Sequence, residues 1–191
     1  MSAVPSTMRE LGSSVIDFEL EDVSTQKSVL LSRAIDKPIL LMFICNHCPF
    51  VLHIAKMMTE LANQAQKDGF FVAAISSNDV LKYPQDSPEN MQVFAKHYNF
   101  DFPYLFDQSQ SIAKNYRAAC TPDFFVYDKE HKLVYRGQMD DARPTNSSIV
   151  SGNDLRNALN AVLRGTRVPQ EQIPSIGCNI KWRSGNEPDY F

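Results

Sequence analysis

Two patterns of apolar residues run along this chain, and they predict strands alternating with helices. Pro38 to Ile44 is almost entirely apolar, which is typical of a strand buried on both faces. Apolar residues then recur at helical spacing from Phe50 to Ala65, and Gly69 follows as a C-terminal cap. A second buried strand is predicted at 70–75. A right-handed crossover through the helix would make the two strands parallel.

The same patterns extend to both sides of this unit. Residues 15–20 alternate between apolar and polar and predict an edge strand, with a hairpin partner at 27–31. Further along, the patterns predict a helix beginning at Pro88, a strand at 102–106, a helix at 109–116, strands at 124–128 and 133–137, and a helix at 154–164. This order implies an α/β fold with a mixed central β-sheet flanked by helices.

The length of the chain fits one domain with extensions at both ends. Of the 191 residues, 1–14 are predicted to form an N-terminal arm and 15–165 the α/β domain. Residues 166–191 are predicted to form an irregular C-terminal tail packed on that domain.

Composition and charge exclude several classes of protein. The net charge is −3 and no basic block is present, so neither nucleic acid nor a membrane is an expected partner. No apolar run reaches the roughly 20 residues of a membrane helix, and the N-terminus lacks the apolar core of a signal peptide, so a cytoplasmic location is expected. The four cysteines are too few for a disulfide-stapled secreted scaffold.

Candidate chemistry is concentrated at the junction between the first buried strand and the long helix. There Cys45-Asn46-His47-Cys48 is followed by Pro49, a residue favoured in the first helical turn. The helix dipole and the free N–H groups at a helix N-terminus favour a thiolate over a thiol. The thiolate is the nucleophile of disulfide exchange, so this pattern predicts a redox-active pair, with two inert core cysteines as the simpler alternative.

Together with Thr121-Pro122 before a predicted β-hairpin, this arrangement resembles the thioredoxin superfamily. The long segment before Thr121 looks like the insertion of its redoxin branch. Five blocks are similar to those of the peroxiredoxin-like, AhpC/TSA-related family with a Cys-Asn-His-Cys-Pro motif: Cys45–Val51, Tyr83–Met91, Ala118–Phe125, Tyr135–Pro144 and Ser175–Trp182. The resemblance covers residues 15–183 and implies a thioredoxin-like fold with an N-terminal β-hairpin.

The resemblance also implies roles for the residues around the dithiol. Pro122 is expected to be cis and to face the dithiol, with Thr121 offering its backbone to an extended substrate. Cys45 is expected to be the nucleophile, because it is nearer the exposed end of the strand-to-helix turn, and Cys48 the resolving thiol. His47 occupies a slot that resembles protein disulfide isomerases, where an imidazolium would stabilise the thiolate; the alternative is an exposed polar residue.

The sequence departs from both neighbouring families at the dithiol. Peroxiredoxins carry Pro-x-x-x-Thr-x-x-Cys; aligned on Cys48, this chain has Leu41 for the proline and Cys45 for the threonine. The hydroxyl that binds peroxide is therefore missing, which disfavours a peroxidase. Thioredoxins have Trp before the first cysteine, where this chain has Ile44, and their preceding strand carries a buried carboxylate that is lacking here.

The remaining candidates are two further cysteines, one acid and a metal site. Cys120 is a possible additional thiol near the dithiol, with burial as a small apolar side chain as the alternative. Cys178 could pair with Cys120 or simply pack. Asp123 is a candidate proton acceptor for the buried thiol. A competing zinc site would use Cys45, Cys48, Cys120 and His47. It lacks the second closely spaced pair of structural zinc sites, so no metal is expected.

The sequence therefore predicts a thiol–disulfide oxidoreductase. In the expected cycle the Cys45 thiolate attacks a substrate disulfide, and Cys48 then resolves the mixed disulfide. The expected partners are a disulfide-containing protein or a small-molecule disulfide and an external thiol reductant, and no bound cofactor is implied. The alternatives are a thiol peroxidase that reduces hydroperoxides, and a non-catalytic binding module or zinc-stabilised domain.

Overall fold

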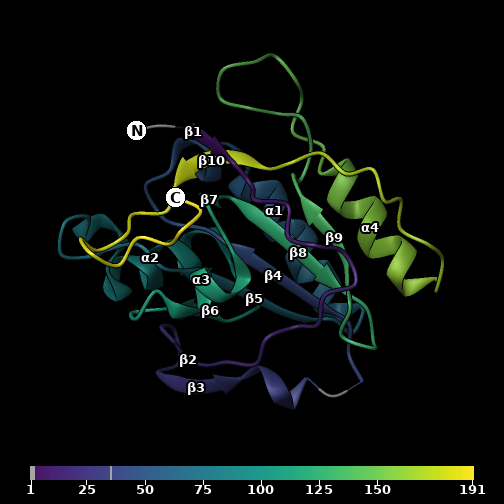
Figure 1. Cartoon of the computed structure of the whole chain (residues 1–191), viewed down its shortest axis with the longest axis horizontal. Coiled ribbons are helices and arrows are strands. Elements are labelled where there is room, and N and C mark those ends of the chain that lie inside the picture. Colours follow the sequence, from purple (N-terminus) through teal and green to yellow (C-terminus); the bar gives the residue numbers. More distant parts are fainter. Residues whose placement is uncertain (1–2, 35) are drawn as a thin grey trace.

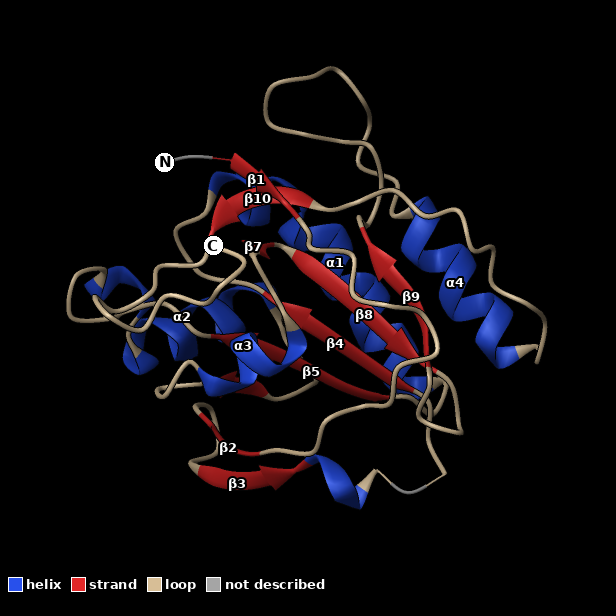
Figure 2. Cartoon of the chain, viewed as in Figure 1, coloured by secondary structure: helices blue, strands red, loops and turns tan. Residues whose placement is uncertain are grey.

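A computed structural model describes residues 3–34 and 36–191 of the chain, shown in Figures 1 and 2. Residues 1–2 of the predicted arm lie outside this range. The described strands are β1 Ala3–Pro5, β2 Glu19–Asp22, β3 Lys27–Leu30, β4 Ile39–Phe43, β5 Phe71–Ser76, β6 Tyr104–Phe106, β7 Cys120–Thr121, β8 Asp123–Tyr127, β9 Leu133–Gly137 and β10 Ile176–Asn179. The helices are α1 Pro49–Lys67, α2 Pro88–Tyr98, α3 Ser111–Tyr116 and α4 Asn153–Leu163, with single 3-10 turns at Leu31–Arg33 and Pro84–Asp86.

A seven-stranded mixed sheet forms the centre of the fold, in the order β3-β2-β6-β5-β4-β8-β9. Strand β4 pairs in parallel with β5 and antiparallel with β8, so the predicted crossover through α1 is confirmed. Figure 2 shows α1 passing behind β4 and β8. The predicted α/β class and mixed sheet are confirmed.

Alternate residues of β4 enter two separate cores, as expected for a strand buried on both faces. Leu40 and Met42 pack with the apolar sides of α1, α2 and α4. Leu41 and Phe43 pack with α3 and with Trp182 of the C-terminal tail. The second core therefore needs a side chain from the far end of the chain.

The predicted edge strand at 15–20 is displaced in the structure, where β2 covers Glu19–Asp22. The Asp17 carboxylate accepts hydrogen bonds from the backbone N–H groups of Phe18 and Ser32, and this local bonding competes with strand pairing. The apolar alternation of this segment reflects burial rather than a hydrogen-bonded ladder.

The predicted C-terminal tail packs on the domain through Trp182, but it is not wholly irregular, and the predicted N-terminal arm also contains a strand. Residues of both pair in a second sheet of order β1-β10-β7, with Ala3 opposite Cys178 and Cys178 opposite Thr121. Figure 1 shows β1 and β10 side by side near the two chain ends. The strands are short and their partners are far apart in sequence, so local periodicity does not indicate them. Within the described residues, no helix has the length and apolar character needed to cross a membrane.

Two fully buried tyrosines of the second core provide a matched test of packing. Tyr127 has no hydrogen-bond partner for its hydroxyl among the described residues, whereas the Tyr116 hydroxyl donates to the carbonyl of Ile16. Tyr127→Phe is expected to leave the free energy of unfolding unchanged or raise it by about 1 kcal/mol, and Tyr116→Phe to lower it by about 1–2 kcal/mol. Urea unfolding measures both; equal losses would contradict this expectation.

Candidate active site

Two thiols lie where β4 gives way to α1. The N–H of Ile44 still bonds to the carbonyl of Ile75 at 3.0 Å, and Cys45 follows. Helix α1 begins at Pro49, which makes Cys48 its N-cap residue. Both thiols are buried, with Cys45 1% exposed and Cys48 0% exposed. The expectation that Cys45 lies toward an exposed end of the turn is wrong, because both sulfurs are buried beneath the turn and only Asn46, His47 and Pro49 reach its surface.

The surroundings favour a thiolate at Cys48. Two neighbouring thiols favour the charged form, Cys178 most strongly and Cys45 second. Together with backbone N–H groups, including that of Val51 in the first turn of α1, they lower the pKa of Cys48 to about 2 against the opposing effect of burial. The hydrogen bond with Cys48, burial and the charge of Asp86 raise the pKa of Cys45 well above its usual range. The surroundings therefore favour a thiolate at Cys48 and a protonated thiol at Cys45.

The segment Thr121-Pro122 lies against both sulfurs. The predicted cis peptide bond between these two residues is confirmed. The Thr121 hydroxyl is 3.4 Å from the sulfur of Cys45. When it is protonated, the Cys48 thiol donates to the Thr121 carbonyl at 3.1 Å. When it is ionised, the neighbouring thiols and backbone N–H groups stabilise its charge instead. The backbone of Thr121 is not open to a substrate as expected, since it pairs with Cys178 of β10.

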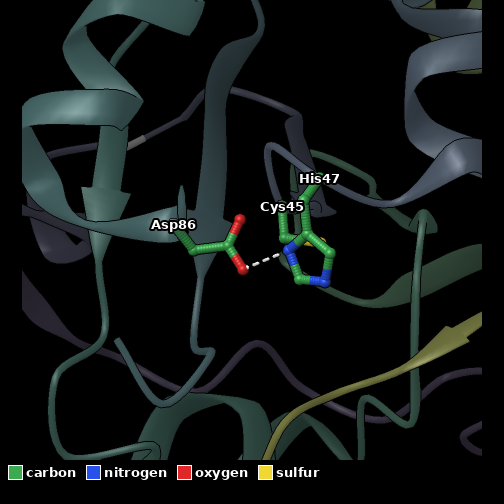
Figure 3. A group of neighbouring side chains, drawn as sticks. All are labelled: Cys45, His47 and Asp86. Atoms are coloured by element: carbon green, nitrogen blue, oxygen red, sulfur yellow. Dashed lines mark hydrogen bonds and ion pairs between the residues drawn. The ribbon is translucent and has the colours of Figure 1, made fainter. Parts of the chain in front are cut away.

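A buried carboxylate holds the residues between the two cysteines (Figure 3). Asp86, which is fully buried, accepts from Nδ1 of His47 at 2.6 Å and from the N–H of Asn46 at 2.8 Å. It also accepts from the side chain of Asn78 at 2.8 Å. The ring of Tyr83 stacks on His47, with centroids 5.6 Å apart. These contacts fix the imidazole plane, and Nε2 of His47 is buried without a partner among the described residues.

Asp86 is a site residue that the sequence reasoning missed. It lies at the end of the 3-10 turn Pro84–Asp86, beyond the polar loop that follows β5. A usable signal is present, because β4 and β5 are parallel and polar residues after their carboxyl ends meet at one edge of a sheet. The strand before the dithiol carries no buried carboxylate, and Asp86 from a later loop supplies one.

The two remaining cysteines differ in what their thiols contact. Cys178 lies in the same core cluster as Cys45 and Cys48 and is the group that lowers the pKa of Cys48 most. Cys120 turns the other way and donates to the carbonyls of Pro122 and Ser175 at 3.6 and 3.9 Å. Burial and the charge of Asp123 raise the pKa of Cys120 well above its usual range. The structure brings Cys178 into the core cluster of the dithiol. Cys120 also lies near enough to Cys48 for charge on that sulfur to raise its pKa, and it is not paired with Cys178.

A metal could be held by one group among the described residues. Cys45, His47 and Asp86 each offer one ligand atom, and these atoms lie within 4.8 Å of one another. Structural zinc sites take four protein ligands, and Nδ1 of His47 already binds Asp86 directly. This set differs from the predicted zinc ligands, because it lacks Cys48 and Cys120 and includes Asp86.

Asp123 is fully buried beside this region but does not serve the dithiol. Its carboxylate accepts from the hydroxyl of Ser6 at 2.9 Å, and its other oxygen lacks a partner among the described residues. Burial raises the pKa of Asp123 from 3.8 to about 8, although Ser6, the Phe124 N–H and Ser175 oppose the shift. Its neighbour among the thiols is Cys120, so the predicted role as proton acceptor for Cys48 has no contact to support it.

This raised pKa predicts how stability changes with pH. A carboxyl whose folded pKa is raised binds its proton more tightly in the folded state, so the free energy of unfolding falls as pH rises from about 4 to about 8. Asp123→Asn is expected to remove that decline, with a gain at pH 8 of at most about 5 kcal/mol and no gain near pH 4. Chemical unfolding at both pH values measures it, with the exposed Asp101→Asn as control. Parallel curves for wild type and Asp123→Asn would refute it.

Comparison with known proteins identifies relatives of the whole chain. A sequence profile described as the AhpC/TSA family matches residues 11–136. The crystal structure of an uncharacterized conserved protein from Geobacillus kaustophilus is 48% identical, with 96% of this chain and 97% of that chain covered and a TM-score of 0.93. A hypothetical protein from Sinorhizobium meliloti 1021 is 46% identical, covering 95% and 99% of the two chains, with a TM-score of 0.91.

More distant structures share the fold alone. A secreted Mycobacterium tuberculosis disulfide oxidoreductase, described as homologous to E. coli DsbE, is 21% identical, covers 75% of this chain and 95% of that chain, and has a TM-score of 0.60. No curated protein matches the chain. The predicted thioredoxin-like fold of the redoxin branch is confirmed by these matches.

Proposed function

This chain belongs to the AhpC/TSA family, and from that premise we propose that it is a thiol–disulfide oxidoreductase whose Cys45 and Cys48 cycle between dithiol and disulfide. The observation that carries the proposal is the pair of free thiols before α1, where the surroundings lower the pKa of Cys48 and raise that of Cys45. Disulfide exchange needs one reactive thiolate and one thiol within reach of it.

The asymmetry sets the order of the steps. The Cys48 thiolate attacks one sulfur of a substrate disulfide, forms a mixed disulfide and releases the other sulfur as a thiolate. Cys45 then loses its proton and attacks the Cys48 sulfur, which releases the second substrate thiol and leaves a Cys45–Cys48 disulfide. Two electrons pass to the substrate, and an external dithiol returns them. This order is the reverse of the one expected from the sequence, because the N-cap residue is the second cysteine.

His47 is the group placed to move the proton of Cys45. Polar atoms of Cys45, His47 and Asp86 lie within 4.8 Å of one another, and Asp86 occupies Nδ1 of the imidazole. The second ring nitrogen is then left to accept or give a proton. A histidine held in this way by a buried carboxylate is a common device for general acid–base catalysis.

Redox titration of the purified protein tests the proposal. The chain is equilibrated with mixtures of reduced and oxidised glutathione, and each cysteine is assigned by alkylation and peptide mass spectrometry. We expect one two-electron transition that converts Cys45 and Cys48 into a disulfide, together with turnover of glutathione disulfide when a dithiol is supplied. A dithiol that stays reduced throughout, or oxidises without turnover, would refute the proposal.

A thiol peroxidase is the second candidate, and the burial of both sulfurs favours it, because a hydroperoxide is smaller than a disulfide. The Cys48 thiolate would take one oxygen from the hydroperoxide and release an alcohol or water. The Cys45 thiol would then condense with the sulfenic acid and release water. The Thr121 hydroxyl lies 3.4 Å from the sulfur of Cys45, the position at which peroxiredoxins carry their threonine. Stopped-flow reaction with hydrogen peroxide, compared with a free thiol at the same thiolate concentration, separates the two candidates.

A further inference from the structure

The backbone edge next to the dithiol is already filled by the chain itself. Strand β10 pairs antiparallel with β7, and Cys178 lies directly opposite Thr121. The N–H of Ile180 continues this pairing to the carbonyl of Ala119 at 3.0 Å. The antiparallel edge beside Thr121 is where an extended polypeptide would add as a further strand. The C-terminal strand therefore occupies the place of a substrate.

The fit between the two strands is close. A Cβ atom on Gly177 would lie 2.0 Å from the carbonyl oxygen of Thr121, so only glycine allows this approach. Beyond the strand, Lys181 is tied to the loop after β5: its N–H donates to the side chain of Asn78 at 2.9 Å and its carbonyl accepts from Asp79 at 2.8 Å. Asn78 also donates to Asp86, so the tail and the His47–Asp86 pair share one network.

The position of Cys178 in this strand is that of a substrate cysteine. Cys178 lies opposite Thr121, whose carbonyl is 3.1 Å from the sulfur of Cys48, so β10 and this sulfur meet at one residue. Cys45, Cys48 and Cys178 belong to one buried core cluster. Cys120, one residue before Thr121, points away from them toward the carbonyls of Pro122 and Ser175.

We propose that β10 is an internal substrate and that Cys178 is a third redox thiol, which exchanges with the Cys45–Cys48 disulfide to give a Cys48–Cys178 disulfide. This inference rests on the proposed dithiol cycle. In the exchange, Cys178 loses its proton and attacks the sulfur of Cys48. The bond between Cys48 and Cys45 breaks, and Cys45 leaves as a thiolate that takes up a proton. No electrons enter or leave, so no further oxidant is needed.

The same arrangement restricts the class of substrate. A protein disulfide that binds by strand addition must first displace β10 from Thr121, whereas a small-molecule disulfide needs no backbone edge. Among disulfides, we therefore assign the small-molecule class, with glutathione disulfide as the probe, as the one that reacts without displacement of β10 from Thr121. Exchange onto Cys178 then leaves the disulfide between Cys48 and Cys178 and returns Cys45 to its thiol form.

The test maps disulfides in the full-length protein after oxidation with glutathione disulfide. Peptides are identified by mass spectrometry without reduction. Cys45→Ser is expected to form an intramolecular Cys48–Cys178 disulfide, and Cys178→Ser to form only Cys45–Cys48. The matched control Cys120→Ser removes a thiol one residue from Thr121 and is expected to form both disulfides, as the wild type does.

The outcomes separate this inference from the dithiol cycle. If Cys45→Ser gives only Cys48 glutathionylation or a Cys48–Cys120 disulfide, the inference is overturned while the cycle stands. If wild type and Cys178→Ser form no Cys45–Cys48 disulfide, the cycle itself fails.

A second variant keeps all four thiols and moves the strand. Gly177→Ala forces β10 away from Thr121, so closure of the Cys48–Cys178 disulfide should slow by up to about 10²-fold, the cost of displacing reacting groups by about 1 Å. The Cys45–Cys48 disulfide should still form, and reduction of insulin disulfides should rise above the wild-type rate because the edge is opened. Unchanged closure and unchanged insulin reduction in a folded Gly177→Ala protein would overturn the proposal.

Discussion

Cys48→Ser is expected to lower kcat/KM for disulfide reduction by at least about 10³-fold, as loss of a nucleophile does in other enzymes. Cys45→Ser should also stop turnover, but it should still complete the first step and accumulate a mixed disulfide on Cys48. The difference follows from the thiolate, which the contacts of the folded chain hold on Cys48 and not on Cys45. Single-turnover mixing with glutathione disulfide, followed by mass spectrometry of the trapped protein, measures both variants.

The same thiolate predicts the pH dependence of alkylation. The pKa of Cys48 is lowered to about 2, so its thiolate is present at all pH values well above 2 and its alkylation by iodoacetamide should be nearly constant between about pH 4 and 8. An ordinary thiol loses its reactivity below its pKa of about 8.5. Cys178→Ala removes the largest stabilising contact and should move the fall in rate toward higher pH, whereas Cys120→Ala should not. A mixed disulfide on Cys45 in the Cys48→Ser protein, or an ordinary profile for Cys48, would refute this assignment.

Asp86→Asn is expected to lower kcat by about 10²-fold, at the lower end of what general acid–base catalysis contributes. The amide has one acceptor where the carboxylate has two, so it cannot hold His47, Asn46 and Asn78 together as Asp86 does. Asp86 acts through His47 and is a positioning residue. The pH profile of kcat should therefore change with the substitution, which a purely structural role would not cause.

Asp107→Asn is the matched control for this substitution. Asp107 is equally buried and accepts from the hydroxyl of Ser77 at 2.9 Å and the N–H of Ala113 at 3.0 Å, but it does not contact His47. Both variants should lose about 1–3 kcal/mol of unfolding free energy, because each weakens a buried hydrogen-bonded network. Only Asp86→Asn should change the pH profile. Equal losses of activity in the two variants would show that Asp86 has no role beyond stability.

The central part of the fold was predictable because its signals are local. The apolar run at β4, the helical spacing of α1 and the proline at its first turn each act within a few residues, and they place the dithiol at the strand-to-helix junction. The hairpin of β8 and β9 follows from the same kind of pattern. The displaced strand β2 shows the limit of such local patterns. The apolar alternation predicts a strand at 15–20, but there the Asp17 carboxylate accepts hydrogen bonds from the backbone N–H groups of Phe18 and Ser32.

The components of the site that the sequence pattern did not predict come from distant parts of the chain. Asp86 reaches His47 only because two parallel strands end at the same edge, which sequence spacing does not express. Cys178 lies on a four-residue strand that is recognisable only once β7 and β1 are beside it. The choice between Cys120 and Cys178 depends on which way each thiol points.

The sequence by itself determined the thioredoxin-like class, the position of Cys45 and Cys48 before α1 and the proline that faces them, since these depend on local propensity and on recognisable blocks. The tertiary structure alone decided which of the two cysteines has surroundings that favour a thiolate, what orients His47 and which third thiol lies in the same core cluster. The physical reason is that a pKa depends on the hydrogen bonds, charges and burial around a group, and here the group with the largest effect, Cys178, lies 130 residues from Cys48 in the chain.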